Sequence, residues 1–316
     1  MISFGYNVFN DILYKPFLSL KNSHCSNTLN TIIFYYIDFK NIISILQEVF
    51  DQLNVLESIH ILYCDSLNSD FIQQITKINN PFKLRSLFMK EILHVESLQF
   101  LLQKIGDYLE NFGFKNRNIE DEYNELKLQL YKLIMKYCTK IRYFDSGIPD
   151  NNIYLFIENN QHNINYLTIN VDIYHYVFAY NELSSTVLQN LGYVLPSKLE
   201  YLCLTLCYRA SDLKIFLKDS QHTFIKKLLI QNLMWEYWDE GDKMLLYIKK
   251  FIMKNERVKY LSFSELSGLG QISTIYNLAY KEEVVNEFKL HNIIVQDHND
   301  LCITACNFIN LPIYDI

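Results

Sequence analysis

Three residues near the C-terminus have the types and the spacing of a metal site. His298, Cys302 and Cys306 follow one another at intervals of four positions, so a single helix over this segment would place all three on one face. Histidine and cysteine are ligands that zinc prefers in proteins. Only three such ligands are local, however, and small cysteine side chains serve equally well as packing in a terminal cap. We therefore expect neither a metal nor another cofactor here.

Acidic clusters are the other residues with catalytic potential. The runs Glu120-Asp121-Glu122 and Glu282-Glu283 fit solvated helix starts better than a pair of catalytic carboxylates, which would need distant residues brought together in a cleft. The sequence contains no glycine-rich phosphate loop, no Gly-x-Ser-x-Gly and no His-Glu-x-x-His, which are motifs that carry known chemistries. The sequence predicts a protein that is not an enzyme.

Composition narrows the range of partners. The chain has 316 residues, half of them apolar, and a formal net charge of -6, which argues against disorder and against nucleic acid as the main partner. The first fifteen residues lack a cationic region followed by a long apolar run, and no early apolar stretch approaches the roughly 20 residues that cross a membrane. Seven cysteines at irregular distances predict reduced thiols. We expect an intracellular protein, cytoplasmic or nuclear, without a membrane partner.

A repeated pattern indicates which elements position the side chains. Apolar residues recur at the first, fourth and sixth positions of a short unit, as in Leu56-Glu57-Ser58-Ile59-His60-Ile61. A step of three followed by a step of two is typical of a turn that enters a strand with one buried face. Ten units match this pattern, and they start at residues 29, 56, 84, 109, 141, 164, 199, 225, 258 and 285. A repeat of roughly 20 to 29 residues with this pattern is typical of leucine-rich repeats.

The segments between these units have helical spacing. Ile42, Ile45, Leu46 and Val49 are one example, and such spacing predicts an amphipathic helix. The expected fold is α/β, a leucine-rich-repeat solenoid or horseshoe with a parallel concave β-sheet and outer helices. We assign residues 1–28 to an N-terminal cap or flank, 29–293 to about ten repeats and 294–316 to a C-terminal cap. The alternatives are a generic helical protein and an α-helical repeat array, which would lack β-favouring stretches such as Tyr166-Leu167-Thr168-Ile169.

Three stretches carry a resemblance to a known group. They are Leu84-Arg85-Ser86-Leu87, the longer run over 96–112, and Arg257-Val258-Lys259-Tyr260-Leu261. In these the chain resembles the leucine-rich-repeat region of F-box proteins, and specifically the large F-box-like families of certain fungi. The resemblance covers residues from about 29 to 293.

Membership in that group implies a substrate receptor of a cullin-RING ubiquitin ligase. The resemblance implies that the repeats hold a protein target on the concave face and that an N-terminal F-box holds the ligase adaptor. An F-box is not evident in residues 1–28, which lack its Leu-Pro start and its helical apolar spacing, so an adaptor is expected only if an F-box lies upstream. The alternative is a stand-alone regulatory or decoy binding protein without ligase association.

The third position of each unit is expected to face the concave side and a protein partner. Four tyrosines fall in this column, and they are Tyr143, Tyr166, Tyr201 and Tyr260. Tyrosine offers a large contact area with a polar tip, which is why it is enriched in binding hot spots. The competing interpretation is that the rings stack on one another and only stiffen the sheet. If the column binds a partner, replacing Tyr166 and Tyr201 by alanine should weaken binding and barely change the melting temperature.

Two further groups complete the candidate binding residues. The fifth position contains His60 and Phe88, and an exposed Phe88 would be buried by a partner. Trp235 and Trp238, the two tryptophans of the chain, follow the eighth unit. They are either a partner anchor or rings folded back over the helix layer.

Overall fold

The chain divides into two compact units in a computed structural model. The structure describes residues 1–5, 13–90, 95–114, 121–147, 150, 152–171, 177–234, 241–253, 256–267 and 273–309. Unit 1 covers Met1–Arg142 and unit 2 covers Tyr143–Ile316. Both units alternate strands with helices, and the strands pair mainly in parallel. The expected α/β solenoid-like arrangement is therefore confirmed.

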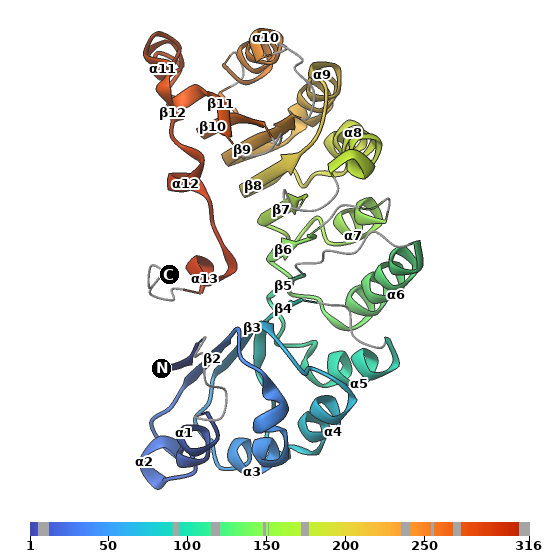
Figure 1. Ribbon diagram of the computed structural model, residues 1–316, viewed down its shortest axis with the longest axis vertical. Coiled ribbons are helices and arrows are strands. Elements are labelled where there is room, and N and C mark those ends of the chain that lie inside the picture. Colours follow the sequence, from blue (N-terminus) through green and yellow to red (C-terminus); the bar gives the residue numbers. More distant parts are fainter. Residues whose placement is uncertain are drawn as a thin grey trace. The chain divides into compact units, whose positions relative to one another are not determined.

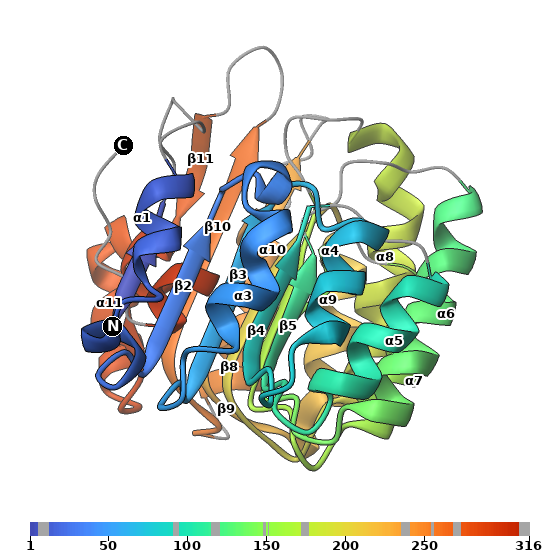
Figure 2. The ribbon, with the colours of Figure 1, turned by 90° about the horizontal axis from the view of Figure 1, so that it is seen from below.

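Unit 1 contains five strands that pair in chain order. Helices alternate with these strands along the chain, and the helices lie on one side of the sheet (Figures 1 and 2). The elements are β1 (Ile2–Phe4), α1 (Tyr14–Ser19), α2 (Ser23–Ser26), β2 (Thr31–Tyr35), η2 (Phe39–Asn41), η3 (Ile43–Ile45), α3 (Leu46–Phe50), β3 (Ser58–Cys64), α4 (Ser69–Lys77), β4 (Leu84–Met89), α5 (Val95–Ile105), β5 (Asn111–Phe114) and α6 (Asp121–Tyr137).

Unit 2 continues the same alternation and ends differently. Strands β6 to β10 pair in parallel and in chain order, whereas β11 pairs antiparallel with β10. The elements are β6 (Tyr143–Asp145), α7 (Ile153–Asn159), β7 (Tyr166–Asn170), α8 (Val177–Val194), β8 (Lys198–Leu206), α9 (Ala210–Asp219), η4 (Ser220–His222), β9 (Phe224–Met234), α10 (Gly241–Ile252), β10 (Val258–Ser267), β11 (Ser273–Asn277), η6 (Leu278–Tyr280), α11 (Glu282–Lys289), β12 (Ile294–Val295), α12 (His298–Leu301) and α13 (Ala305–Phe308).

The apolar pattern of the sequence explains these strands. In the first nine units, the residues at positions one, four and six are all buried, because they point from the strand into the space between sheet and helices. In β8, for example, Leu199, Leu202 and Leu204 have no exposed surface. In the unit that starts at residue 141, the sixth position is Ser146 instead of an apolar residue. Its side chain is nevertheless fully buried, directly after β6.

The tenth unit does not form the expected strand. Val285 and Phe288 lie in helix α11, and Leu290 directly after it is 83% exposed. The spacing of positions one and four suits a helix as well as a strand entry, because residues three apart share one helix face. The actual strand of this region is β12, which pairs with β10 through Ile294 and Val295.

Basic side chains link successive repeats on the helix side. Lys104 donates to the carbonyl oxygen of Thr76 at 3.0 Å, at the end of α4, and Lys140 donates to Asp107 O at 2.8 Å, just past α5. In unit 2 the buried Arg257 donates to Leu217 O at 3.3 Å and to Ser220 O. Each cation meets carbonyl groups near the C-terminus of a helix in the preceding repeat, where the helix dipole favours a positive charge. These contacts fix the stacking of neighbouring repeats.

The strand register follows the repeat except at one place. Ser86 pairs with Asn111, Tyr143 with Tyr166, and Tyr166 with Tyr201, as the aligned third positions predict. Between β3 and β4 the register shifts, so that Ser86 lies opposite His60 rather than Ser58. This shift brings a histidine into a column of hydroxyl side chains. Among the described helices, none is both long enough and apolar enough to cross a membrane.

Candidate functional site

The candidate site is the inner face of each sheet, defined as the face opposite the α-helices of that unit. Positions three and five of each repeat project there because strand side chains alternate between the two faces. The two units carry different side chains on this face. In unit 1 the third-position residues are Thr31, Ser58, Ser86 and Asn111, and in unit 2 they include four tyrosines.

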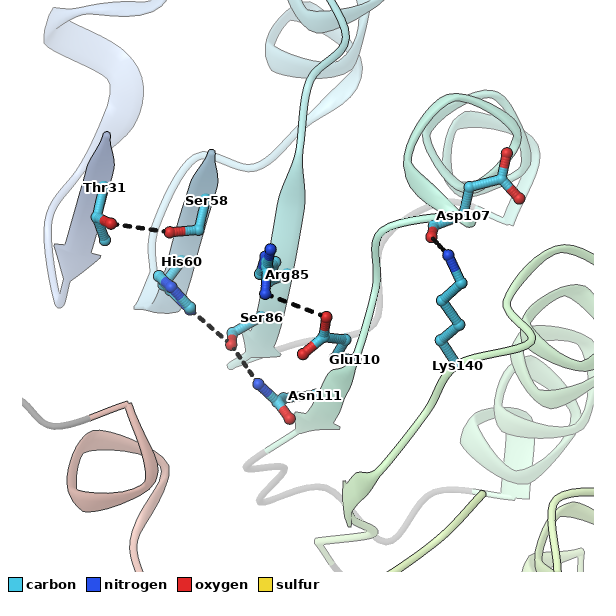
Figure 3. Close-up of polar contacts among 9 residues, drawn as sticks. All are labelled: Thr31, Ser58, His60, Arg85, Ser86, Asp107, Glu110, Asn111 and Lys140. Carbon is cyan, nitrogen blue, oxygen red and sulfur yellow. Dashed lines mark hydrogen bonds and ion pairs between the residues drawn. The ribbon is translucent and has the colours of Figure 1, made fainter. Parts of the chain in front are cut away.

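Unit 1 carries a ladder of hydrogen bonds on its inner face, which Figure 3 shows. Ser58 Oγ donates to Thr31 Oγ1 at 3.0 Å. Asn111 Nδ2 donates to Ser86 Oγ at 2.8 Å, and Ser86 Oγ lies 2.7 Å from His60 Nδ1. Each contact joins two neighbouring strands, so the ladder fixes the register of the sheet.

His60 is the titratable member of this ladder. Burial, assisted by the positive charge of Arg85, lowers the pKa of His60 from 6.5 to about 4. A neutral imidazole with its proton on Nε2 can accept a hydrogen bond at Nδ1 from the Ser86 hydroxyl, which itself accepts one from Asn111. The contact resembles the nucleophile and base pair of hydrolases. Ser86 has no exposed surface, however, so its oxygen faces neighbouring side chains and not solvent.

An aromatic cluster in unit 1 was missed by the sequence reasoning. Tyr36 and Tyr63 both follow the core of a strand at the eighth repeat position, and both have positive φ angles of 51° and 52°. Their ring centroids are 5.4 Å apart, and Tyr63 lies 5.9 Å from Phe88. Positive φ is costly for a bulky residue. The signal in the sequence was the recurrence of tyrosine at the eighth position of the first two repeats.

A charged pair completes this cluster. Lys90 lies 5.2 Å from the centre of the Tyr36 ring and forms an ion pair with Asp65 at 2.6 Å. Phe88 itself is fully buried, so the expectation of an exposed Phe88 is wrong. Tyr36 and Tyr63 are half-buried, as is Tyr35, whose ring centroid lies 4.6 Å from that of Tyr36.

Unit 2 carries the expected tyrosine column, but the column is covered. Tyr143, Tyr166, Tyr201 and Tyr260 lie on β6, β7, β8 and β10. Residues Asp297–Ile309, which we call the arm, run across the inner face of these strands (Figure 1). Tyr143 and Tyr201 are consequently buried, while Tyr166 and Tyr260 are half-buried. The expectation that all four rings face an open surface is wrong for Tyr143 and Tyr201.

Two tyrosine hydroxyls hold the main chain of one arm residue. The amide of Ile303 donates to Tyr201 Oη at 3.0 Å, and Tyr143 Oη donates to the Ile303 carbonyl at 3.1 Å. Burial raises the pKa of both tyrosines, so both hydroxyls keep their protons at neutral pH. The two contacts pair both main-chain groups of Ile303, and neither contact involves its side chain.

Apolar contacts flank this clamp on both sides. Leu301 packs into a buried cluster with Tyr201, Cys203 and Leu229. The ring of Phe308 lies 4.9 Å from Tyr143 and 4.8 Å from Tyr166, measured between ring centroids. Aromatic pairs at these separations are favourable. The inner face of unit 2 therefore holds a peptide segment through one main-chain clamp and two apolar anchors.

The C-terminal histidine and cysteines do not share one helix. His298 begins α12, which ends at Leu301, and Cys306 lies in α13, which begins at Ala305. The single helix expected over these residues is wrong, because Asp297 and Thr304 each cap a separate turn. Among the described residues no group of His, Cys, Asp or Glu has the arrangement of a metal site. Burial raises the pKa of Cys203 to about 12 and also raises that of Cys302, so both are protonated thiols.

The tryptophans cannot be placed on either face. Trp235 and Trp238 lie outside the residues that the structure describes. The arm was the main feature that sequence reasoning missed. Its only signal was a C-terminal stretch after the last repeat unit with apolar residues at 301, 303, 308 and 309.

Comparisons with known proteins place the chain in no family. No protein-family model matches it, and a search of curated proteins found no significant match.

Proposed function

We propose that this chain is a protein-recognition scaffold that binds partner segments against the inner faces of its sheets. The observation that supports it most is the clamp on Ile303, in which two hydroxyls of the tyrosine column bond both main-chain groups of one residue. Main-chain bonds give affinity to any segment in that conformation, and flanking pockets give selectivity. A face that seats one peptide segment has the chemistry to seat another.

The inner face of unit 1 supplies a second surface of a different kind. Its hydroxyl, amide and imidazole groups bond one another, and the nearby half-buried ring of Tyr36 packs on Tyr63 and lies beside Lys90. Half-exposed aromatic rings next to a cation suit the rim of a protein interface. We assign partner contact in unit 1 to this aromatic cluster rather than to His60 and Phe88.

A finer proposal is that the scaffold is the substrate-recognition part of an F-box-type ubiquitin ligase receptor. It is supported by the resemblance over residues 84–87, 96–112 and 257–261, which coincide with β4, with α5 and the start of β5, and with the start of β10. Such a receptor works inside the cell, in the cytoplasm or nucleus, where cysteines are kept as thiols, and the seven cysteines form no disulfides with one another. The stand-alone regulatory or decoy protein has the same binding faces without the adaptor.

Selection of displayed peptides on the immobilised full chain tests the general proposal. We expect selected peptides to lose at least about tenfold in affinity when Tyr166 or Tyr36 is replaced by alanine. Leu246→Ala is the matched control, because Leu246 is 65% exposed on the outer helix α10. Peptides that bind all of these variants equally would remove the inner faces as the recognition surface.

Adaptor binding separates the finer proposal from its alternative. The purified adaptor of a cullin-RING ligase is passed over the immobilised chain and over a form extended at its N-terminus by the upstream gene sequence. Retention by either form supports the ligase receptor. Retention by neither leaves the stand-alone scaffold.

A further inference from the structure

The arm has the properties of an internal ligand. Building on the proposed function, we infer that Asp297–Ile309 occupies the partner site of unit 2 and that a partner protein displaces it with a segment of the same chemistry. That segment carries a leucine and, seven positions later, an aromatic residue, as do Leu301 and Phe308. The clamp and both anchors lie within unit 2.

The contacts of the arm define what the site recognises. The clamp reads the main chain of one residue at position 303, and it accepts any residue except proline there, because proline has no amide hydrogen. Leu301 is almost fully buried by Tyr201, Cys203 and Leu229, whereas Phe308 is half-buried between Tyr143 and Tyr166. A buried leucine and a clamped main chain fix the register of the segment, and the aromatic residue adds selectivity.

The arm and strand β10 both carry buried polar atoms that are not hydrogen-bonded within the described part of the chain. His298 Nδ1 and Asn307 Oδ1 on the arm, and Ser262 Oγ on β10, are buried without a hydrogen-bond partner among the described residues. Buried polar groups in native proteins are nearly always paired. A partner segment that avoids or pairs these groups therefore binds better than the arm itself.

The internal structure of the arm offers little resistance to displacement. Helices α12 and α13 have four residues each, and helices this short have no stability apart from their packing. Residues 302 and 303 between them form no helix. The arm therefore keeps its conformation only while it lies on the tyrosine column.

The base of the arm is fixed independently of the column. Asn277 Nδ2 donates to Asp297 Oδ2 at 2.6 Å, Tyr280 Oη donates to the same oxygen at 3.2 Å, and the amide of Gln296 donates to Leu261 O at 3.0 Å. These bonds tie Gln296 to β10, and Asp297 to the last residue of β11 and to η6. The arm can thus leave the column by a rotation that begins at His298, with β12 still paired to β10.

This attachment determines which segment occupies the site of unit 2 when no partner is bound. A segment tethered a few residues from its site acts at an effective concentration in the millimolar range, so the chain's own arm outcompetes a free segment of equal affinity. The arm of a second copy has no such advantage. A partner gains access when its segment binds more tightly than the arm or when it also contacts another part of the chain.

A synthetic peptide of residues 297–309, labelled with fluorescein at its N-terminus, tests the inference by anisotropy. The proteins are the full chain, the full chain with Leu301→Ala and Phe308→Ala together, and the milder full-chain Phe308→Ala. The peptide should bind the double variant at least about tenfold more tightly than the unchanged chain, because its own arm no longer competes. It should bind Phe308→Ala about fivefold more tightly, because the arm of that variant competes less strongly. Leu246→Ala should bind it as weakly as the unchanged chain does.

Two altered peptides test the clamp and the register. A peptide N-methylated at the residue corresponding to Ile303 lacks the donor to Tyr201, and it should bind the double variant about tenfold more weakly. A scrambled peptide of the same composition should show no saturable binding. Circular dichroism and melting confirm that each protein is folded, and Phe308→Ala serves alone if the double variant is not.

Three outcomes overturn the inference. They are equal peptide binding to the unchanged chain and the variants, equal binding of the N-methylated peptide, and a concentration-dependent dimer of the unchanged chain that dissociates in the arm variants. The last outcome would assign the column to the arm of a second copy. These results differ from failure of the proposed function, in which the arm peptide binds as expected but no displayed peptide selected on the chain depends on either inner face.

Discussion

The two inner faces use the same repeat position in opposite ways. In unit 1 this position carries short polar side chains, and they bond one another from strand to strand, as Thr31 with Ser58 and Ser86 with Asn111. In unit 2 it carries four tyrosines, and the hydroxyls of Tyr143 and Tyr201 bond a segment laid across the sheet. Side-chain length at one position thus separates a face that satisfies itself from a face that needs an occupant.

The two faces also differ in whether the groups on them can leave while the sheet stays folded. The polar ladder of unit 1 is part of the sheet and cannot be separated from it. The arm of unit 2 contacts the sheet through side chains, those of the column and of Cys203, Leu229 and Asn277, and can leave while the strands remain paired. Replacing residues on the two faces should therefore give effects of different size and kind, from the largest to the smallest below.

Tyr201→Ala should have the largest effect. The ring is fully buried between the sheet and the arm, so its removal leaves a cavity and costs about 3–5 kcal/mol of unfolding free energy in urea. The half-buried Tyr166→Ala should cost less than half as much. The sequence alone had predicted little change for both, and equal small effects would mean that the arm does not cover Tyr201.

Acid should destabilise unit 1 through His60. Its pKa is about 4 in the folded protein and 6.5 when exposed, so the unfolded chain binds the proton more tightly. The stability linked to neutral His60 is fully present above pH 6.5 and is lost as the pH falls toward 4, up to about 3 kcal/mol.

His60→Gln tests this linkage because glutamine does not titrate. The variant should show a smaller loss of unfolding free energy between pH 6.5 and pH 4 than the unchanged chain. His162→Gln, at an exposed position, is the matched control and should leave the slope as it is. A His60→Gln variant with an unchanged slope would show that the imidazole is not buried in the ladder.

Ser86→Ala should have an intermediate effect confined to unit 1. It leaves the Asn111 amide and His60 Nδ1 without the hydroxyl that joins them, which costs about 2 kcal/mol for buried polar groups. Thr31→Ala, at the half-buried end of the ladder, should cost under about 1 kcal/mol. Hydrogen exchange should locate the loss of protection in β3 to β5, and a loss located in the arm would contradict the separation of the two faces.

Phe308→Ala should have the smallest effect on stability. Its ring is half-buried and pairs with Tyr143 and Tyr166, so its removal costs about 1 kcal/mol. Hydrogen exchange should increase along the arm and remain unchanged in β2 to β5. A global loss of protection would mean that the arm is an integral part of the core.

The sequence predicted the positions of the strands better than the contacts on the inner face of the sheet. The steps of three and two residues located nine strand units correctly, because burial at positions such as Ile59, Leu202 and Leu261 is a local requirement of each repeat. The same steps wrongly predicted a strand at Val285, where the three-residue spacing belongs to helix α11. The register shift at His60 depends on a bulge that no spacing indicates.

The site was predicted only in part. The tyrosine column was visible because it recurs with the repeat, but its cover was not, since the arm reaches Tyr143 from 160 residues away in the sequence. Contacts at such separations depend on how the whole chain folds and leave no local pattern. The positive φ angles of Tyr36 and Tyr63 were equally invisible, because tyrosine is not a residue that favours this conformation.

Hydrogen exchange at the amide of Ile303 tests the central claim most directly. If the tyrosine column holds the arm, this amide is protected in the unchanged chain and loses much of its protection in Tyr201→Phe, which removes only the accepting hydroxyl. Protection in β2 to β5 stays the same in both proteins. An Ile303 amide that exchanges in the unchanged chain as fast as in an unfolded peptide would contradict the account.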